Sequence, residues 1–372
     1  MPRDPSSSFD PQRDLFDATT GSTITHGALT RSIQRIAGDG GSAIGAAIPS
    51  EPLAALAAQL ESRFGGRLYL GTSSWNCPGW SGLVWDEQGY SEAQLARDGL
   101  RAYAQHPLLR TVSLGGLQRA IDRDTCAHLA GQTPERFRFV VHASREITDA
   151  VLRSRDNGTP LRDNPRFLDA CLALDGVVTP AVEGLGQRLG AIVFQFPPLP
   201  VHWLRNGRAL LDRMETLWRA VVPAMPAGAL TAIEVSDSRM LTPALIAQLA
   251  RHRVAYCIGL HDNMPLLRQQ MAAAHHAGGS GDLICRWSLR PGVRYNQAKA
   301  QWAPFNRMQA PDLATRDALA QAIVGTLSAG HRAFVTIDNE AEGSAPLSVI
   351  ELAGSILREA GTTPKRLGTI PA

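Results

Sequence analysis

Short apolar segments alternate with amphipathic segments along most of the chain. Eight apolar runs, each bounded by turn residues, have the length and the β-branched content of buried strands. They begin at Leu68, Thr111, Phe137, Ala191, Leu230, Val254, Asp282 and Ala333. Continuously apolar strands that are separated by helices are typical of a parallel sheet covered by helices. The pattern therefore predicts eight strand–helix units.

The segments between these runs have helical periodicity. They include residues 91–106, 164–178, 209–222, 242–252, 265–276, 312–327 and 346–360. Eight such units in about 300 residues fit a closed (β/α)8 barrel of the TIM type, and no glycine-rich dinucleotide turn follows the first strand. The predicted fold class is therefore α/β, with a single TIM-like barrel favoured over a doubly wound sheet. Long segments after the first, third and seventh strands are expected to lengthen the loops at the C-terminal rim.

The N-terminal part differs in composition from the rest of the chain. Residues 1–50 are rich in Ser, Thr, Gly, Asp and Pro and have no sustained periodicity, which predicts a flexible extension. From residue 51 onward, apolar side chains fall on one helical face, namely Leu53, Leu56, Leu60 and Phe64, and Gly65 ends this helix. We expect the barrel domain to occupy residues 51–366.

Composition excludes several classes of protein. The 372 residues, 44% of them hydrophobic, contain neither a stretch of membrane-spanning length nor an N-terminal segment of signal-peptide type, so a cytoplasmic protein without a membrane partner is expected. The 5 cysteines include no CxxC pair, which favours reduced thiols over disulfides or a zinc knuckle. The net charge of +3 is scattered, so nucleic acid is a less favoured partner. The chain has only two lysines, Lys299 and Lys365, in polar contexts that do not favour Schiff-base chemistry.

Polar residues collect where the predicted strands end, and barrels place their active sites at these ends. The candidate ligand-binding residues are Trp75, Trp80, Gln195, Arg286, Trp287, Asp338 and Asn339. Carboxylates, imidazoles and guanidinium groups at one rim suit a small hydroxylated or anionic ligand. The tryptophans could stack on a planar ligand, a nucleobase or a sugar, but closure of the rim by packing is the favoured interpretation.

Glu234 and His142 are the candidate catalytic residues. Glu234 follows an apolar run in which burial would raise its pKa, which favours a general acid or base, while an ion pair with Arg286 that closes the barrel end explains the same pattern. His142 either contacts a ligand or makes a structural hydrogen bond.

Cofactor motifs are absent from the sequence. There is no Walker-type phosphate loop, no HExxH and no GxSxG nucleophile elbow. We predict no cofactor and assign no metal ligands, although oxygen and imidazole ligands from separate strand ends could hold a divalent metal. The four residues in question are Glu234, His261, Asp262 and Asp338.

Six sequence blocks occur in the order found in one known family. They are GTSSWNCPGWSGLVW, QTPERFRFVVHASREIT, GAIVFQFPP, AIEVSDSRM, CRWS and IDNEAEGSAPLSVIELA. Together they resemble the domain-of-unknown-function 72 family, also called YecE-like, from about Leu68 to Ala360. The resemblance implies a barrel of the predicted kind and a pocket that retains Glu234, Arg286 and Asn339, but it implies no particular reaction.

The chain departs from the family pattern at the rim. The resemblance implies that family members typically have a carboxylate, an amide, a lysine, a histidine and an arginine at five rim positions. In this chain the corresponding residues are Ser113, Gly115, His142, Asp149 and Ser236. It therefore implies a pocket that has been rebuilt beside the second, third and fifth strands.

Three functions remain open from the sequence. The first is an enzyme with Glu234 as acid or base, Arg286 as anion anchor, and Gln195 and Asn339 as orienting groups. The second is a non-catalytic protein that binds a small ligand or regulates, and the third is a metal-assisted hydrolase. The expected partner in each case is a small molecule, and no oligomeric state is predicted.

Overall fold

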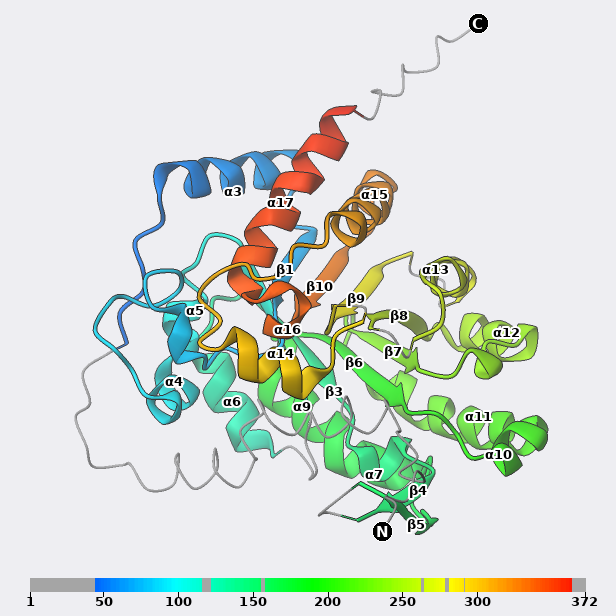
Figure 1. The fold of residues 1–372 in the computed structure, drawn as a ribbon. Coiled ribbons are helices and arrows are strands. Elements are labelled where there is room, and N and C mark those ends of the chain that lie inside the picture. The colour runs from blue at the N-terminus through cyan, green and yellow to red at the C-terminus, as the bar shows by residue number, and fades with distance from the viewer. Residues whose placement is uncertain are drawn as a thin grey trace, which may run out of the picture.

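The chain folds into a closed barrel of parallel strands, as the computed structural model shows for residues 44–115, 122–154, 158–261, 264–277, 281–290 and 292–362 (Figure 1). The strands are β1 (Leu68–Thr72), β2 (Leu109–Leu114), β3 (Arg138–His142), β6 (Leu189–Phe196), β7 (Leu230–Val235), β8 (Ala255–Leu260), β9 (Leu283–Trp287) and β10 (Ala333–Ile337). Their order around the barrel is β1-β10-β9-β8-β7-β6-β3-β2. All eight predicted strands are present, and the predicted (β/α)8 architecture is confirmed.

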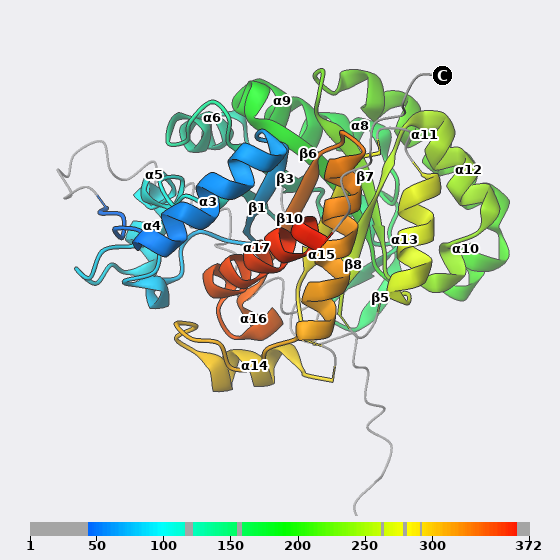
Figure 2. The ribbon, with the colours of Figure 1, turned by 90° about the horizontal axis from the view of Figure 1, so that it is seen from above.

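Helices surround the barrel on its outer side (Figure 2). They are α3 (Glu51–Phe64), α4 (Glu92–Asp98), α5 (Leu100–Tyr103), α6 (Arg123–Gly131), α7 (Arg145–Thr148), α8 (Ala170–Ala173), α9 (Thr179–Leu185), α10 (Val201–Arg205), α11 (Gly207–Ala224), α12 (Pro243–His252), α13 (Leu267–His276), α14 (Tyr295–Trp302), α15 (Leu313–Ser328), α16 (Asn339–Glu342) and α17 (Ala345–Thr362). The helix α3 has the predicted bounds, because Gly65 takes a left-handed conformation at φ 58° and ends it. This helix packs on α17.

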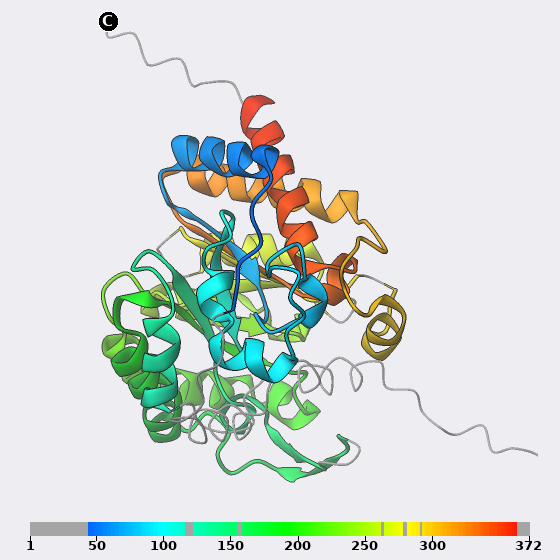
Figure 3. The same ribbon diagram turned by 90° about the vertical axis from the view of Figure 1, so that its left-hand side faces the viewer.

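Two elements after β3 differ from the sequence prediction. The helix expected from residue 164 begins only at Ala170, because the Asn164 side chain donates to the carbonyls of Glu146 and Asp149 at 2.8 and 2.7 Å and holds the preceding segment as a loop. A hairpin of β4 (Val151–Arg153) and β5 (Pro160–Asp163) was not predicted. It projects from the body of the barrel (Figures 1 and 3), and its half-buried and exposed residues lack an apolar pattern.

Side chains alternate between the barrel interior and the outer helical layer. The interior cluster consists of Tyr69, Val140, Ala191, Val193, Leu230, Ala232, Ala255, Cys257, Ile284 and Phe334. The rings of Tyr69 and Phe334 stack within it, with centroids 4.6 Å apart. The interior is therefore a packed core, and only the last inward-facing layer of the strands can present chemistry to a ligand.

Two long segments cover the C-terminal side of the barrel. The segment after β1 buries Trp80 and Trp85, whose rings stack at 6.3 Å. The segment after β9 carries α14, which packs beside α16 (Figure 1) and forms a small apolar cluster of its own. These are two of the three places where long rim loops were expected.

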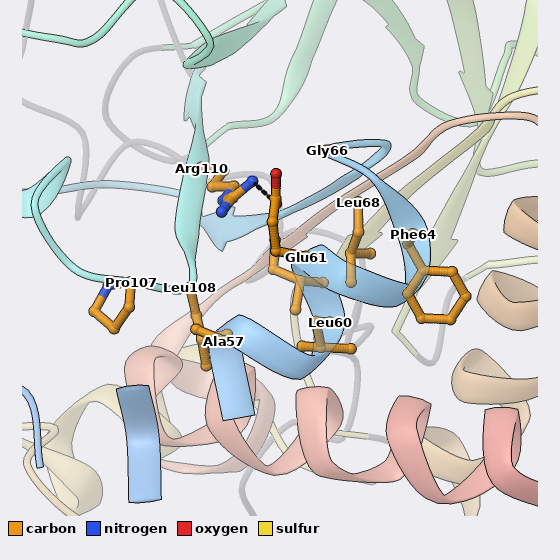
Figure 4. Close-up of a pocket in the computed structure, with 10 residues that line it drawn as sticks. Ala57, Leu60, Glu61, Phe64, Gly66, Leu68, Pro107, Leu108 and Arg110 are labelled. Carbon is orange, nitrogen blue, oxygen red and sulfur yellow. Dashed lines mark hydrogen bonds and ion pairs between the residues drawn. The ribbon is translucent and has the colours of Figure 1, made fainter. Parts of the chain in front are cut away.

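A shallow groove lies at the opposite, N-terminal end of the strands, between α3 and the start of β2 (Figure 4). Its walls are mainly apolar, with Leu60, Phe64 and Leu108 among them, and Glu61 pairs with Arg110 at its edge. Residues at this end of a TIM-type barrel serve stability in general, so the groove is not the candidate site. No helix in the described part of the chain is both long enough and apolar enough to cross a membrane.

The junction of β1 and β2 depends on a buried tyrosine. The register between the two strands shifts at Leu70 and Gly71. The hydroxyl of Tyr103, on α5, accepts a hydrogen bond from the backbone N–H of Thr72 at 3.0 Å and donates one to the carbonyl of Thr111 at 2.9 Å. This hydroxyl therefore links the two strands where their ladder is irregular.

We expect Tyr103→Phe to lower the free energy of unfolding by about 1–3 kcal/mol, because it leaves buried backbone groups without a partner. Tyr256→Phe is a matched control, since the Tyr256 ring is also buried but its hydroxyl has no hydrogen-bond partner among the described residues. Urea denaturation of both variants measures the difference. Equal losses of stability would contradict the role given to the Tyr103 hydroxyl.

Candidate functional site

The last inward-facing positions of the strands are mostly polar. Except for Ser113, which lies two residues beyond Thr111, each lies two residues beyond a member of the interior apolar cluster. Successive side chains of a strand point to opposite faces. These positions hold Gly71, Ser113, His142, Gln195, Glu234, Gly259, Arg286 and Thr336. Asp338 lies two residues beyond Thr336, immediately after the end of β10. The candidate site is this ring at the C-terminal mouth of the barrel.

A buried ion pair occupies the centre of the ring. Arg286 donates from Nη2 to Oε1 of Glu234 at 2.7 Å and from Nε to Oε2 at 3.1 Å. Gln195 donates to the same Oε1 at 3.1 Å. A Cβ at position 259 would lie 3.0 Å from Glu234 Oε1 and 2.5 Å from Met264 Cε, so Gly259 leaves room for the carboxylate. The structure thus joins three of the predicted site residues in one network.

The pKa of Glu234 is shifted in the direction opposite to the one expected from the sequence. Burial raises it, but the charge and the hydrogen bonds of Arg286 outweigh burial, and the pKa lies below its ordinary value. Glu234 is 0% exposed. A carboxylate in this state stays ionised and holds the guanidinium in place, whereas a general acid needs a raised pKa.

Asp338 is one of two carboxyls after β10 whose pKa is raised, and Glu340, whose pKa burial raises to about 8, is the other. The Oδ2 of Asp338 lies 4.0 Å from Nη1 of Arg286, and its side chain is 18% exposed. Burial raises its pKa to about 6, against the opposing charge of Arg286. Asp338 lies near Nη1 of Arg286, whereas Glu234 binds Nε and Nη2.

His142 is paired with a residue that sequence reasoning missed. The Oγ of Ser113, on the neighbouring strand β2, lies 2.9 Å from its Nε2. Burial, followed by the charge of Arg286, lowers the pKa of His142 to about 4, so the imidazole is neutral at pH 7. The sequence could have identified Ser113 from the alternation of side chains along β2, because Ser113 lies two residues beyond the inward-facing Thr111.

A metal site was the third interpretation of this rim. His261, which follows β8, is buried, and burial lowers its pKa to about 3. Among the described residues, no group of three or more His, Cys, Asp or Glu side chains is arranged to hold a metal ion. Asp262, however, lies outside the described residues, and the metal alternative stays untested.

The predicted aromatic contacts lie away from the centre of the ring. Trp287 follows Arg286 by one residue, so it points to the outer core, where it is 0% exposed. The indole of Trp75 donates to the carbonyl of Ala96 at 3.3 Å. Buried indoles have no open face on which a ligand or a nucleobase could stack.

Asn339 and Trp80 hold the rim segments together. Asn339 Oδ1 accepts hydrogen bonds from the indole of Trp80 and from the backbone N–H of Ala345, both at 3.0 Å. The pair fixes the segment after β1 against α16. In the structure both residues therefore have contacts that position the rim.

The fold and the ring define a TIM-type barrel protein with a polar site at its C-terminal mouth. The family described as "Protein of unknown function DUF72" matches residues 69–368, and the chain belongs to this family. The resemblance seen in the sequence blocks is thereby confirmed. A search of curated proteins found no match.

Solved structures of the same family are similar to this chain. A DUF72 family protein from Thermotoga maritima is 13% identical, with a TM-score of 0.48, and the match covers 78% of this chain and 99% of that one. A DUF72 family protein from Enterococcus faecalis is 16% identical, with a TM-score of 0.47, and the match covers 81% of this chain and 99% of that one.

We expect Glu234→Gln to lower the free energy of unfolding by about 3–5 kcal/mol, because it leaves the buried charge of Arg286 without its main partner. Asp212→Asn is the control, since Asp212 and Arg208 form an exposed pair at 3.0 Å, and its loss should cost about 0.5 kcal/mol or less. Urea denaturation at pH 7 compares the two. A change at Glu234 as small as that at Asp212 would refute the structural importance of the pair.

Asp338→Asn should become more stable than the wild type as the pH rises. The raised pKa of Asp338 means that the folded state resists its ionisation, so stability is lost between pH 3.8 and about 6 and stays lower above that range. The variant cannot ionise, and its advantage at pH 7 should reach up to about 3 kcal/mol. Denaturant titrations from pH 4 to pH 7 test this, with Asp212→Asn as control. A difference between wild type and variant that does not change with pH would contradict the shift.

Proposed function

We propose that the barrel mouth binds a small hydroxylated or anionic molecule and performs acid/base chemistry on it, with Asp338 as the group that gains and loses the proton. The observation that carries this proposal is the arrangement of Asp338 beside Arg286. A partly exposed carboxyl with a pKa of about 6 lies 4.0 Å from a buried guanidinium. A pKa near the working pH is the property that an acid/base group needs.

Arg286 is the anion anchor in this proposal. Glu234 binds two of its nitrogens and neutralises its charge, which makes the buried guanidinium tolerable. When Asp338 is protonated, the three groups together carry no net charge. Of these groups, only Glu234, which is paired with Arg286, then carries a negative charge. Above pH 6 the ionised Asp338 would repel an anionic ligand, so anions should bind more tightly below pH 6 than above it.

The remaining residues position these groups. Glu234 fixes the orientation of Arg286 through two hydrogen bonds, and Gln195 donates a hydrogen bond to Glu234. In this proposal the carboxylate of Glu234 anchors Arg286 and is not the acid or base. His142 is neutral at pH 7 and can donate or accept a hydrogen bond toward a ligand.

A second candidate function is the binding of such a molecule without turnover. It is favoured by the residues that depart from the family pattern, since Ser113, Gly115 and Ser236 offer no charge at the rim. Ser236 is buried, and its hydroxyl has no partner among the described residues. Binding and turnover are separated by the experiment below.

The protein is incubated in D2O with small α-hydroxy and α-keto carboxylates. Proton NMR follows line broadening on binding, and exchange for deuterium of the proton on the carbon next to the carboxylate (α-hydroxy compounds) or next to the ketone (α-keto compounds). We expect exchange with at least one compound, and Asp338→Asn should slow it by about 100-fold or more. Asp212→Asn serves as the control and should exchange at the wild-type rate.

The outcomes separate the candidates. Binding without exchange favours the non-catalytic protein and overturns acid/base chemistry. Neither binding nor exchange, at pH 5 and at pH 7, would overturn the assignment of the mouth to small anions altogether. Exchange that a chelator abolishes would instead support the metal-dependent alternative.

A further inference from the structure

Ser113 and His142 form a hydrogen-bonded pair on adjacent strands at the barrel mouth. The register of β2 and β3 pairs Ser113 with Val140, so His142 lies two residues further along, on the same face. The hydroxyl oxygen and Nε2 are 2.9 Å apart, and the two residues are 4% and 6% exposed. Nucleophile and base lie at this separation in enzymes that use an activated serine.

The surroundings fix the imidazole in the orientation that this chemistry needs. A Cβ at position 115 would lie 3.0–3.4 Å from three atoms of His142, so Gly115 lets the chain pass close to the ring without displacing it. The ring is neutral at pH 7, and a neutral imidazole is the form that can accept a proton from a hydroxyl.

We propose that Ser113 is a nucleophile activated by His142, and that the protein transfers the acyl group of small esters that carry a carboxylate. The choice of a carboxylate-bearing ester rests on the function proposed above, because Arg286 is the group that would hold the carboxylate. Arg286 and His142 both hold last inward-facing positions of their strands, so a ligand in the barrel mouth lies between them.

The anionic substrate also favours the reaction. Burial is the main cause of the low pKa of His142, the charge of Arg286 lowers it further, and Glu234 opposes that effect. A bound carboxylate would act in the same direction as Glu234 and raise the basicity of the imidazole.

The steps balance without a cofactor. Oγ of Ser113 attacks the ester carbonyl while Nε2 of His142 takes the hydroxyl proton. The bond between the carbonyl carbon and the alkoxy oxygen then breaks, and His142 returns the proton to the departing alcohol. Water, activated by the same imidazole, attacks the acyl-serine, releases the carboxylic acid and restores the Ser113 hydroxyl.

The test uses the full-length wild-type chain and a small fluorophosphonate, which modifies activated serines with loss of fluoride. Mass spectrometry of peptides should find one adduct on Ser113. Ser113→Ala should abolish this adduct, and His142→Gln should slow its formation by about 100-fold or more while the variant keeps its melting temperature.

A second variant keeps the proposal testable if Ser113→Ala fails to fold. Ser113→Cys places a thiol against the imidazole, which should make this cysteine react with iodoacetamide faster than the partly buried Cys77 of the same chain. Peptide mapping distinguishes it from the native cysteines.

Absence of a Ser113 adduct in the folded wild type, or equal rates in His142→Gln, would show a structural hydrogen bond only and overturn the proposal. The α-proton exchange experiment is carried out on the same wild-type protein. Exchange without labelling refutes the nucleophile alone, and labelling without exchange refutes the acid/base role of Asp338 alone.

Discussion

The neutralisation of one buried guanidinium organises the mouth of this barrel. Arg286 cannot lose its charge, so its burial at the end of β9 requires a carboxylate of matching geometry, which Glu234 provides from β7. The rest of the ring depends on this pair. The strand between them, β8, must present Gly259 because a larger residue would displace the carboxylate. The same charge opposes the rise in the pKa of Asp338 and helps to keep His142 neutral.

The fold was predictable from the sequence because each strand of a parallel barrel is buried on both faces. Runs such as AIVFQF and VAYCIGL are apolar at nearly every position, and the helices between them have a clear period. The β4–β5 hairpin escaped prediction for the opposite reason, since neither of its strands is fully buried. The late start of α8 depends on the hydrogen bonds of the Asn164 side chain to the carbonyls of Glu146, in α7, and Asp149, 18 and 15 residues away, which no local pattern reveals.

The sequence predicts which residues lie at the strand ends better than it predicts their pKa values. Gln195, Glu234, Arg286 and Asp338 were identified from their positions at strand ends, and strand parity places Trp287 on the outer face beside Arg286. The direction of the pKa shift of Glu234 could not be inferred from the sequence. It depends on whether the guanidinium of Arg286 binds both oxygens of the carboxylate. Ser113 was overlooked as a functional residue because its meaning comes from His142, which lies 29 positions further along the chain.

The seam between β1 and β2 bears on the order in which the barrel assembles. Tyr103 comes from the connection between these two strands, so the contacts that seal them join residues close together in the chain. Pairing of β1 with β10 instead joins opposite ends of the domain, and contacts of long sequence separation are slow to form. We expect the nascent barrel to persist as an open, curved sheet until β10 docks. Pulse-labelling hydrogen exchange during refolding would show this as late protection of the β10 amides.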